Sequence, residues 1–480
     1  MRRIALSVLI ASAALAAPAH AQPEAGPAAR RARELIALIN AATPPDIRAY
    51  ADSVYGDGFR EIPMAEHVGF VLSERDRSRG MDIHGFQDST ATLAVALVRT
   101  RLTNTWRAIA VRVEPDPPYR IVGIGTRPPQ PPTAATVVPA SDAERVRLLD
   151  EFVSALAKAD VFSGAVLLAK DGTILLAKAW GEANKDFGVP NRVDTKFNLG
   201  SMNKMFTAVA IAQLVEAGKL SFDDSLAKFL PDFPTPEAAR KIRIKHLLSH
   251  TAGLGSYFND EFMAASRERF RTVDEMMTLA QGDSMAFEPG TRWSYSNTGM
   301  LVLGKVIEVV AGVDYFTYIR SHISEPAGMV NSDAYELDLV NPNLAVGYEK
   351  EFLDDGTIRF RNNVFRHVMR GGPAGGGYST VEDLLRFAEA LRGGKLVGPE
   401  TVRLLTTPKP ELSSPRYGYG FSTPPDGGPV GHSGGFDGIS SNLDMYLESG
   451  YVAVVMSNYG GGSSPVSARM RELIGRTTVP

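Results

Sequence analysis

The first part of the chain changes from a helical to an extended pattern of apolar residues. Residues 30–40 repeat apolar positions at helical spacing, and Pro44 and Pro45 follow where that pattern ends. Three later stretches alternate apolar and polar positions, as strands of an antiparallel meander do: residues 91–100, 105–113 and 119–125. Helices followed by strands predict a small α+β domain over residues 27–126, for which a cone-shaped sheet around a helix is one architecture.

Strand patterns lie at both ends of the remaining chain, and helical patterns lie between them. Residues 164–170 and 173–180 are apolar runs joined by Asp171-Gly172, which is the strongest short-range signal for a β-hairpin. A second hairpin is predicted over residues 443–457. We therefore expect the domain over residues 141–480 to be α+β, with one antiparallel sheet flanked by helices and an inserted all-helical region.

A proline-rich segment separates these two parts. Prolines cluster in residues 127–140, and such clusters favour an extended, semi-rigid spacer over a packed element. The segment is therefore predicted to be the linker between the small domain and the large one.

The N-terminus has the pattern of a secretory signal. Arginines follow Met1, residues 4–17 are apolar or small, and Ala19-His20-Ala21 forms a cleavage signature after a proline. The apolar run is short for a helix that crosses a bilayer, so residues 1–21 are predicted to be a signal peptide. We expect a secreted protein, with the periplasm as its compartment and with no integral membrane segment after signal removal.

Composition narrows the possible chemistry. The chain has 480 residues, 44% of them hydrophobic, and its net charge of −3 argues against a nucleic-acid partner, which requires a basic surface. It contains no cysteine, which removes disulfides, thiol nucleophiles and cysteine-based metal sites. Its eight histidines show no metal-binding spacing, so no metal and no cofactor is predicted.

The helical pattern with the most chemical information follows Ser201. Residues 205–215 are apolar nearly all round, which indicates a buried helix, and Lys204 lies one turn after Ser201. Burial lowers the pKa of an amine, so Lys204 can take the proton of the Ser201 hydroxyl, which is a poor nucleophile until a base removes it. Ser225 and Lys228 have the same S-x-x-K spacing, but their surroundings indicate an exposed turn.

A second candidate group is Tyr295, two residues before Asn297. A Pro-Gly turn precedes this pair and a predicted helix follows it, which is a rigid support for an exposed functional group. Its phenol could move protons, and the Asn297 amide could position a substrate amide. The same Y-x-N spacing at Tyr257 lacks this context. Taken alone, Tyr295 would more often be a core tyrosine.

A third candidate segment comes at the entry to the last hairpin. It consists of His432, Ser433, Gly434 and Gly435, which we predict to be a substrate-binding strand edge. Glycines let a strand edge approach a ligand closely with its backbone N–H groups exposed. Those groups, together with the N–H of Ser201, could form an oxyanion hole.

The three motifs in this order resemble the serine β-lactamase and penicillin-binding-protein family. S-x-x-K at Ser201, Y-S-N at Tyr295 and H-S-G at His432 look most like class C β-lactamases, D-alanyl-D-alanine carboxypeptidases and related esterases. The likeness covers about residues 145–475 and no part of the small domain. It implies a β-lactamase/transpeptidase-like fold for the large domain.

The resemblance also implies roles for individual residues. Ser201 would be acylated, and Lys204 and Tyr295 would share the proton transfers, without a decision on which is the general base. Asn297 would help to orient the substrate. The backbone N–H groups of Ser201 and Gly435 would form the oxyanion hole.

One departure from the family pattern bears on the substrate. His432 stands where many members carry a lysine, and a histidine is largely neutral at pH 7, so it holds a substrate carboxylate poorly. This favours a broad-specificity esterase or amidase acting on a small ester, amide or peptide. The alternatives are a β-lactamase or D-alanyl-D-alanine carboxypeptidase, and a catalytically silent binding or regulatory protein on the same fold.

Overall fold

The computed structural model describes residues 26–130, 139–424 and 427–475. The predicted signal peptide and most of the predicted linker lie outside these ranges. The chain divides into two compact units, with a division after Val137. The hairpin segment Glu351–Arg359 groups with the N-terminal unit, and the rest of the chain forms the C-terminal unit.

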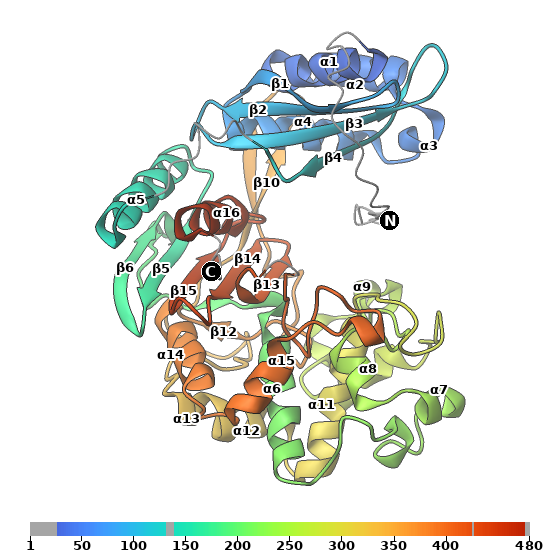
Figure 1. The fold of residues 1–480 in the computed structure, drawn as a ribbon, viewed down its shortest axis with the longest axis vertical. Helices are drawn as coiled ribbons and strands as arrows, with labels where there is room; N and C mark the ends of the chain where they lie inside the picture. The colour runs from blue at the N-terminus through green and yellow to red at the C-terminus, as the bar shows by residue number, and fades with distance from the viewer. Residues whose placement is uncertain (1–25, 131–138, 425–426, 476–480) are drawn as a thin grey trace. The chain divides into compact units, whose positions relative to one another are not determined.

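The N-terminal unit consists of helices followed by a four-stranded antiparallel sheet (Figure 1). Its elements are α1 (Pro27–Ala41), α2 (Pro44–Val54), α3 (Asp57–Arg60), α4 (Met64–Ser78), β1 (Met81–Ser89), β2 (Leu93–Thr100), β3 (Trp106–Val113) and β4 (Ile121–Arg127). The strands follow one another in the order β1-β2-β3-β4, and α1 packs against β1, β2 and β3. The first helix and the last three strands agree with the sequence pattern, whereas that pattern did not predict α4 and β1.

The C-terminal unit is built on a five-stranded antiparallel sheet in the order β13-β14-β15-β5-β6. The strands are β5 (Gly164–Lys170), β6 (Thr173–Trp180), β13 (Val430–Phe436), β14 (Ile439–Met445) and β15 (Tyr451–Ser457). Asp171 and Gly172 join β5 to β6 with φ angles of 48° and 76°, as a tight hairpin turn requires. Because β15 pairs with β5, both ends of the unit share one sheet, and this prediction is confirmed.

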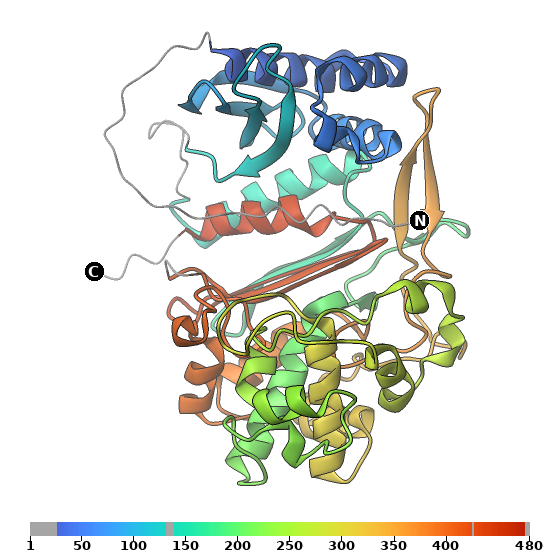
Figure 2. The same cartoon turned by 90° about the vertical axis from the view of Figure 1, so that its right-hand side faces the viewer.

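Helices cover both faces of this sheet. Figure 2 shows α5 (Asp142–Lys158) and α16 (Ser463–Ile474) on one face and the helical region on the other. The further helices are α6 (Asn203–Glu216), α7 (Pro236–Lys241), α8 (Ile244–Leu248), α9 (Asp260–Ala264), α10 (Val273–Met277), α11 (Asn297–Ala311), α12 (Tyr315–Ile319), α13 (Glu325–Ala327), α14 (Val381–Arg392) and α15 (Pro399–Thr406). The short strands of this unit are β7 (Glu182–Asn184), β8 (Val189–Pro190), β9 (Phe197–Asn198) and β12 (Tyr378–Ser379). The paired strands β10 (Tyr348–Phe352) and β11 (Ile358–Asn362) belong to it only in part, because they include the segment Glu351–Arg359. The predicted α+β architecture is confirmed.

The core of this unit surrounds α6, which is apolar on nearly all sides. Ala208, Val209 and Ile211 are fully buried, and α6 packs against α11. Burial of a helix on every side agrees with its sequence pattern. Removing this much apolar surface from water fixes the position of the first turn of α6, which carries the candidate chemistry.

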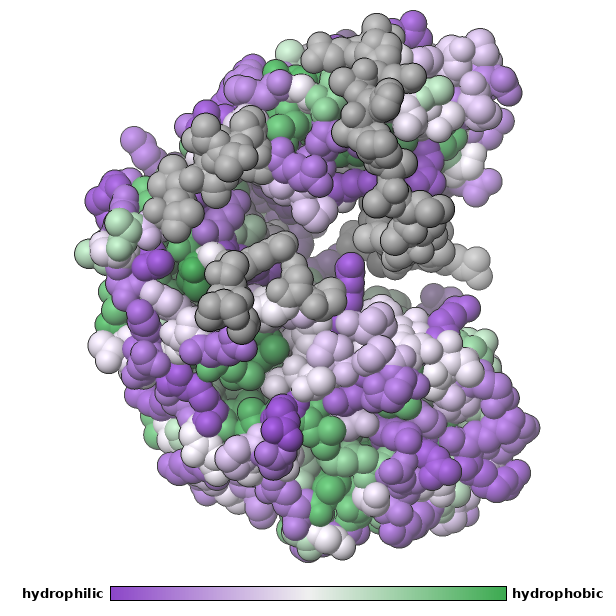
Figure 3. Space-filling model, in the orientation of Figure 1, coloured by the Kyte–Doolittle hydropathy of each residue, from purple (hydrophilic) through white to green (hydrophobic). Residues whose placement is uncertain are grey.

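The surface around α7 is hydrophilic on the face drawn in Figure 3. Figure 3 shows hydrophilic residues over α7, where Glu237, Arg240 and Lys241 are exposed. Across the described residues, no helix combines the length and the apolar character needed to cross a bilayer.

Candidate active site

Ser201 lies in a single turn of 3₁₀-helix that connects β9 to α6. Gly200 adopts φ = +50°, and a Cβ there would come within 3.0 Å of backbone atoms of Gly434. Only glycine fits both the left-handed backbone and this close approach. The side-chain oxygen of Asn198 also accepts a 2.8 Å hydrogen bond from the Gly200 N–H. The local sequence therefore holds Ser201 against strand β13.

Lys204 has a fully buried amine, and this burial favours its neutral form. Its Nζ lies 2.9 Å from Asn297 Oδ1, 2.5 Å from the Ala374 carbonyl oxygen and 3.0 Å from Ser201 Oγ. Burial lowers the pKa of Lys204 well below its ordinary value. A neutral amine has two N–H donors, and the two carbonyl-type oxygens accept both of them. The nitrogen lone pair then faces the Ser201 hydroxyl.

Tyr295 contacts both the nucleophile and Lys204 from the segment just before α11. Its hydroxyl hydrogen-bonds with the Ser201 side chain, and burial raises the pKa of the phenol. The ring lies 4.8 Å from Lys204 Nζ. Ser296 caps α11 by accepting a hydrogen bond from the Gly299 N–H, which fixes the backbone beside Tyr295. The structure thus brings the first three predicted residues together.

Asn297 faces Lys204 with its oxygen, and its amide nitrogen donates a 3.0 Å hydrogen bond to Ser256 Oγ. Both ends of this side chain are therefore occupied within the protein. The amide oxygen orients the lysine directly, and the second N–H of the amide nitrogen remains able to meet a substrate.

Strand β13 presents an edge to this site. The N–H and C=O of Gly431 pair with Ser422 on the side away from β14. Because successive residues of a strand alternate, the N–H groups of Ser433 and Gly435 face this same edge. Gly434 packs against Leu199, two residues before the nucleophile. The edge thus runs past Ser201 with donors turned outward.

His432 is buried beside this edge, and both of its ring nitrogens are hydrogen-bonded. Nδ1–H donates to the Ser433 carbonyl oxygen at 2.5 Å, and Nε2 lies 2.9 Å from the Tyr417 hydroxyl. Burial lowers the pKa of His432 to about 3, the nearby Lys204 amine acts in the same direction, and the Ser433 hydrogen bond opposes them. The imidazole is therefore neutral at ordinary pH.

A comparison of the sequence with known protein families identifies the family of this chain. The Beta-lactamase family model matches residues 149–475. The chain belongs to this family. It is similar to esterase EstB of Burkholderia gladioli, with 28% identity over 72% of this chain and 97% of the esterase. The structure of a penicillin-binding protein from Bacillus halodurans has a TM-score of 0.61 and 31% identity, over 68% of this chain and 98% of that chain.

An amide-cleaving relative extends this comparison. A D-stereospecific amidohydrolase from Streptomyces sp. has a TM-score of 0.56 and 26% identity, over 71% of this chain and all (100%) of that chain. The chain is accordingly a serine hydrolase of the β-lactamase family, with esterase and amidase relatives. The predicted β-lactamase/transpeptidase-like fold is also confirmed.

The second S-x-x-K in this β-lactamase-family chain has a structural role. Lys228 forms an ion pair with Asp224, and 54% of its side chain is exposed. Its amine is thus engaged with a carboxylate at the surface and is not directed at Ser225. The interpretation of this motif as an exposed turn is confirmed.

Sequence reasoning missed two contributors to the site of this family member. The Ala374 carbonyl comes from the glycine-rich segment 371–377, whose sequence by itself indicates only a tight turn. In addition to turning, this segment hydrogen-bonds to the nucleophile turn through the Gly376 N–H and the Gly200 carbonyl. Tyr417 had no signal in the sequence, because its contact with His432 depends on the packing of a separate loop.

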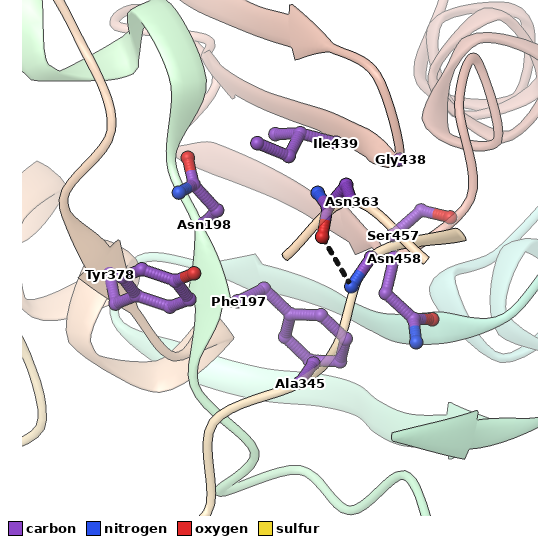
Figure 4. A pocket seen from close by; sticks show the side chains of 10 residues that line it. Phe197, Asn198, Ala345, Asn363, Tyr378, Gly438, Ile439, Ser457 and Asn458 are labelled. Atoms are coloured by element: carbon purple, nitrogen blue, oxygen red, sulfur yellow. Dashed lines mark hydrogen bonds between the residues drawn. The ribbon is translucent and has the colours of Figure 1, made fainter. Parts of the chain in front are cut away.

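A small cavity lies beside the segment that leads to the nucleophile. Figure 4 shows Phe197 and Asn198 of β9 in its lining, together with Asn363 from a separate loop. Asn363 accepts a hydrogen bond from the Gly347 N–H at 3.2 Å. The cavity is thus lined in part by β9, the strand that leads into the nucleophile turn, and Ser201 is not part of its lining.

The packing of Gly434 on Leu199 gives a test of this geometry. A Cβ at Gly434 would lie 2.0 Å from the Leu199 carbonyl oxygen, so Gly434→Ala must move β13 away from the nucleophile turn. Displacements near 1 Å cost up to about 100-fold in rate, and we expect a kcat/KM loss of that order for ester hydrolysis. Gly435→Ala, with its nearest neighbour at 3.9 Å, should cost less; equal losses would contradict this account.

Proposed function

We propose that this protein is a secreted hydrolase that cleaves esters or amides through an acyl-enzyme on Ser201, with broad specificity. The observation that carries the proposal is the environment of Lys204. Its two carbonyl acceptors take both N–H donors of a neutral amine and leave the lone pair 3.0 Å from the nucleophile. This is the arrangement that a general base requires.

Acylation of Ser201 couples each bond change to a proton transfer. Ser201 Oγ bonds to the substrate carbonyl carbon while its proton passes to Lys204 Nζ. The carbonyl oxygen becomes an oxyanion, which the N–H groups of Ser201 and Gly435 stabilise. When the intermediate collapses, the bond to the leaving group breaks, and the Lys204–Tyr295 pair returns the proton to that group. Water then attacks the carbonyl carbon of the Ser201 ester and gives its proton to the Lys204–Tyr295 pair. The ester bond breaks, the acid is released, and the pair returns the proton to Ser201 Oγ.

The relatives and the site together favour esters and amides as substrates. One relative is an esterase and one structural neighbour is a D-stereospecific amidohydrolase. A neutral His432 gives no positive charge for a substrate carboxylate. The second candidate, a β-lactamase or D-alanyl-D-alanine carboxypeptidase, is favoured by the 31% identity to a penicillin-binding protein over 98% of that chain. Export through the predicted signal at residues 1–21 is part of the proposal.

A fluorophosphonate probe tests the nucleophile directly. Intact-protein mass should show one covalent adduct, and peptide mapping should place it on Ser201. Turnover of p-nitrophenyl butyrate should accompany labelling and exceed that of nitrocefin, which reports β-lactam cleavage. A folded protein without an adduct or turnover would favour the silent binding protein. An adduct on Ser225 would contradict the assignment of Ser201.

A further inference from the structure

Tyr417 completes the hydrogen bonding of His432. The Ser433 carbonyl oxygen can only accept, so Nδ1 carries a proton, and the Tyr417 hydroxyl lies 2.9 Å from Nε2. Only 4% of Tyr417 is exposed, and its ring lies at 89° to the imidazole. In the neutral ring with its proton on Nδ1, neither nitrogen of His432 is therefore left to bind a substrate.

The position of Tyr295 identifies which part of a substrate passes His432. The leaving group must take a proton from the Lys204–Tyr295 pair, so it departs on the side where Tyr295 lies. The rings of Tyr295 and His432 are 6.3 Å apart. His432 therefore borders the leaving-group side of the candidate active site. On the opposite side of Gly435, β13 continues to Phe436, whose ring lies 5.8 Å from that of Phe258.

We propose that Tyr417 is a specificity-determining residue that occupies Nε2 of His432, so that the enzyme selects uncharged leaving groups and rejects leaving groups with a carboxylate. This inference rests on the proposed function of Ser201. Tyr417 acts through His432 and does not touch the reacting atoms. A carboxylate there would lose water without gaining a donor from the imidazole, which is unfavourable in a partly buried site.

The groups around the imidazole reinforce this selection. Lys204 and His250 face it, and burial lowers the pKa of each well below its ordinary value. The third facing group, Tyr295, has a raised pKa and is neutral as well. These groups surround His432 with uncharged side chains, so the hydrogen bond from Tyr417 meets no competing charge.

Two matched thioesters test the proposal. Phenylacetyl thioesters of thioglycolamide and of thioglycolic acid differ only by the carboxylate on the leaving group. Thiol release can be followed with a disulfide reagent, because the chain contains no cysteine. In the wild type we expect kcat/KM for the amide to exceed that for the acid by about 100-fold, as for sites that leave a polar group unpaired.

Variants locate the cause of this ratio. His432→Lys supplies a cation and should lower the amide-to-acid ratio by at least about 10-fold. Tyr417→Phe frees the Nε2 lone pair to take a proton and then donate to the carboxylate, so it should lower the ratio in the same direction. Because the ratio is measured within each variant, losses of folded protein cancel. Nitrogen-15 shifts of His432 in the wild type should show a proton on Nδ1 and none on Nε2, and the Nε2 shift should change in Tyr417→Phe, which a tyrosine without a hydrogen bond to Nε2 would not cause.

Three results would overturn the inference. Equal kcat/KM for the two thioesters in the wild type would do so, as would a ratio that Tyr417→Phe leaves unchanged, or an Nε2-protonated imidazole at pH 7. Turnover of p-nitrophenyl butyrate distinguishes a failure of the specificity inference from a failure of the proposed function. If it persists, only the specificity inference has failed; if it is absent together with turnover of both thioesters, the proposed function itself has failed.

Discussion

Ser201→Ala is expected to lower kcat/KM for p-nitrophenyl butyrate by about 10⁴-fold or more, because catalysis through a covalent intermediate has no other route in this site. The fluorophosphonate adduct should disappear at the same time. The hydroxyl contacts Lys204 and Tyr295 without being part of the apolar core, so the variant should fold as the wild type does. Turnover and intact-protein mass measure the two effects.

Ser225→Ala is the matched control for this prediction. Ser225 begins the second S-x-x-K, whose lysine is exposed and paired with Asp224. Its removal should leave turnover and labelling unchanged. Retained activity in Ser201→Ala, or a loss of activity in Ser225→Ala, would assign the nucleophile to Ser225 instead of Ser201.

The sheet of the C-terminal unit could be predicted because its signals are local. Asp171-Gly172 has the positive φ angles that its turn requires, and the strands on either side are continuous apolar runs. The small unit was harder. Strand β1 contains few apolar residues, and its pairing with β2 shifts register at Gly85 and again at Asp88. An interrupted alternation of this kind gives no clear strand pattern.

The start of α14 offers two neighbouring hydroxyl residues for one role. The N-cap is Thr380, which accepts a hydrogen bond from the Asp383 N–H. Ser379 instead hydrogen-bonds with Ser332 in the interior. Neighbouring hydroxyl residues can exchange such roles, and long-range packing decides between them.

In the candidate site, too, some residues could be predicted from local sequence and others could not. Ser201 and Lys204 could be predicted because helical spacing alone brings them together. The partners that set the lysine's protonation state, Asn297 and the Ala374 carbonyl, lie 93 and 170 residues away in the chain. The contact between Tyr417 and His432 spans only 15 residues, yet it joins a loop to a strand and follows no periodicity. Spacing identifies the reacting groups, and tertiary packing determines their charge.

Lys204→Met gives the second large effect, and it acts on both activity and stability. Loss of a general base costs about 10²–10⁴-fold, so we expect kcat/KM for p-nitrophenyl butyrate to fall within that range. The fluorophosphonate should still react with Ser201, but more slowly. A loss of less than about tenfold would mean that Tyr295 alone activates the nucleophile.

The stability of the same variant has a pH dependence with a definite sign. Burial lowers the pKa of Lys204 below its ordinary value of 10.5, so the unfolded chain binds a proton that the folded chain lacks. Wild-type stability should therefore rise with pH across the window between the lowered pKa and 10.5, as this cost disappears. Lys204→Met removes the titrating group, so its stability relative to the wild type should be highest near neutral pH and should decline as the pH approaches 10.5.

Lys228→Met is the control for both measurements. Lys228 is exposed and forms one surface ion pair, so its replacement should change the free energy of unfolding by about 1 kcal/mol or less and leave turnover unchanged. Denaturant unfolding of both variants across pH 6 to 10 makes the comparison on one scale. A parallel pH dependence in wild type and Lys204→Met would mean that Lys204 is charged in the folded protein. In that state its three acceptors bind an ammonium ion, and the proton of Ser201 must leave by way of Tyr295.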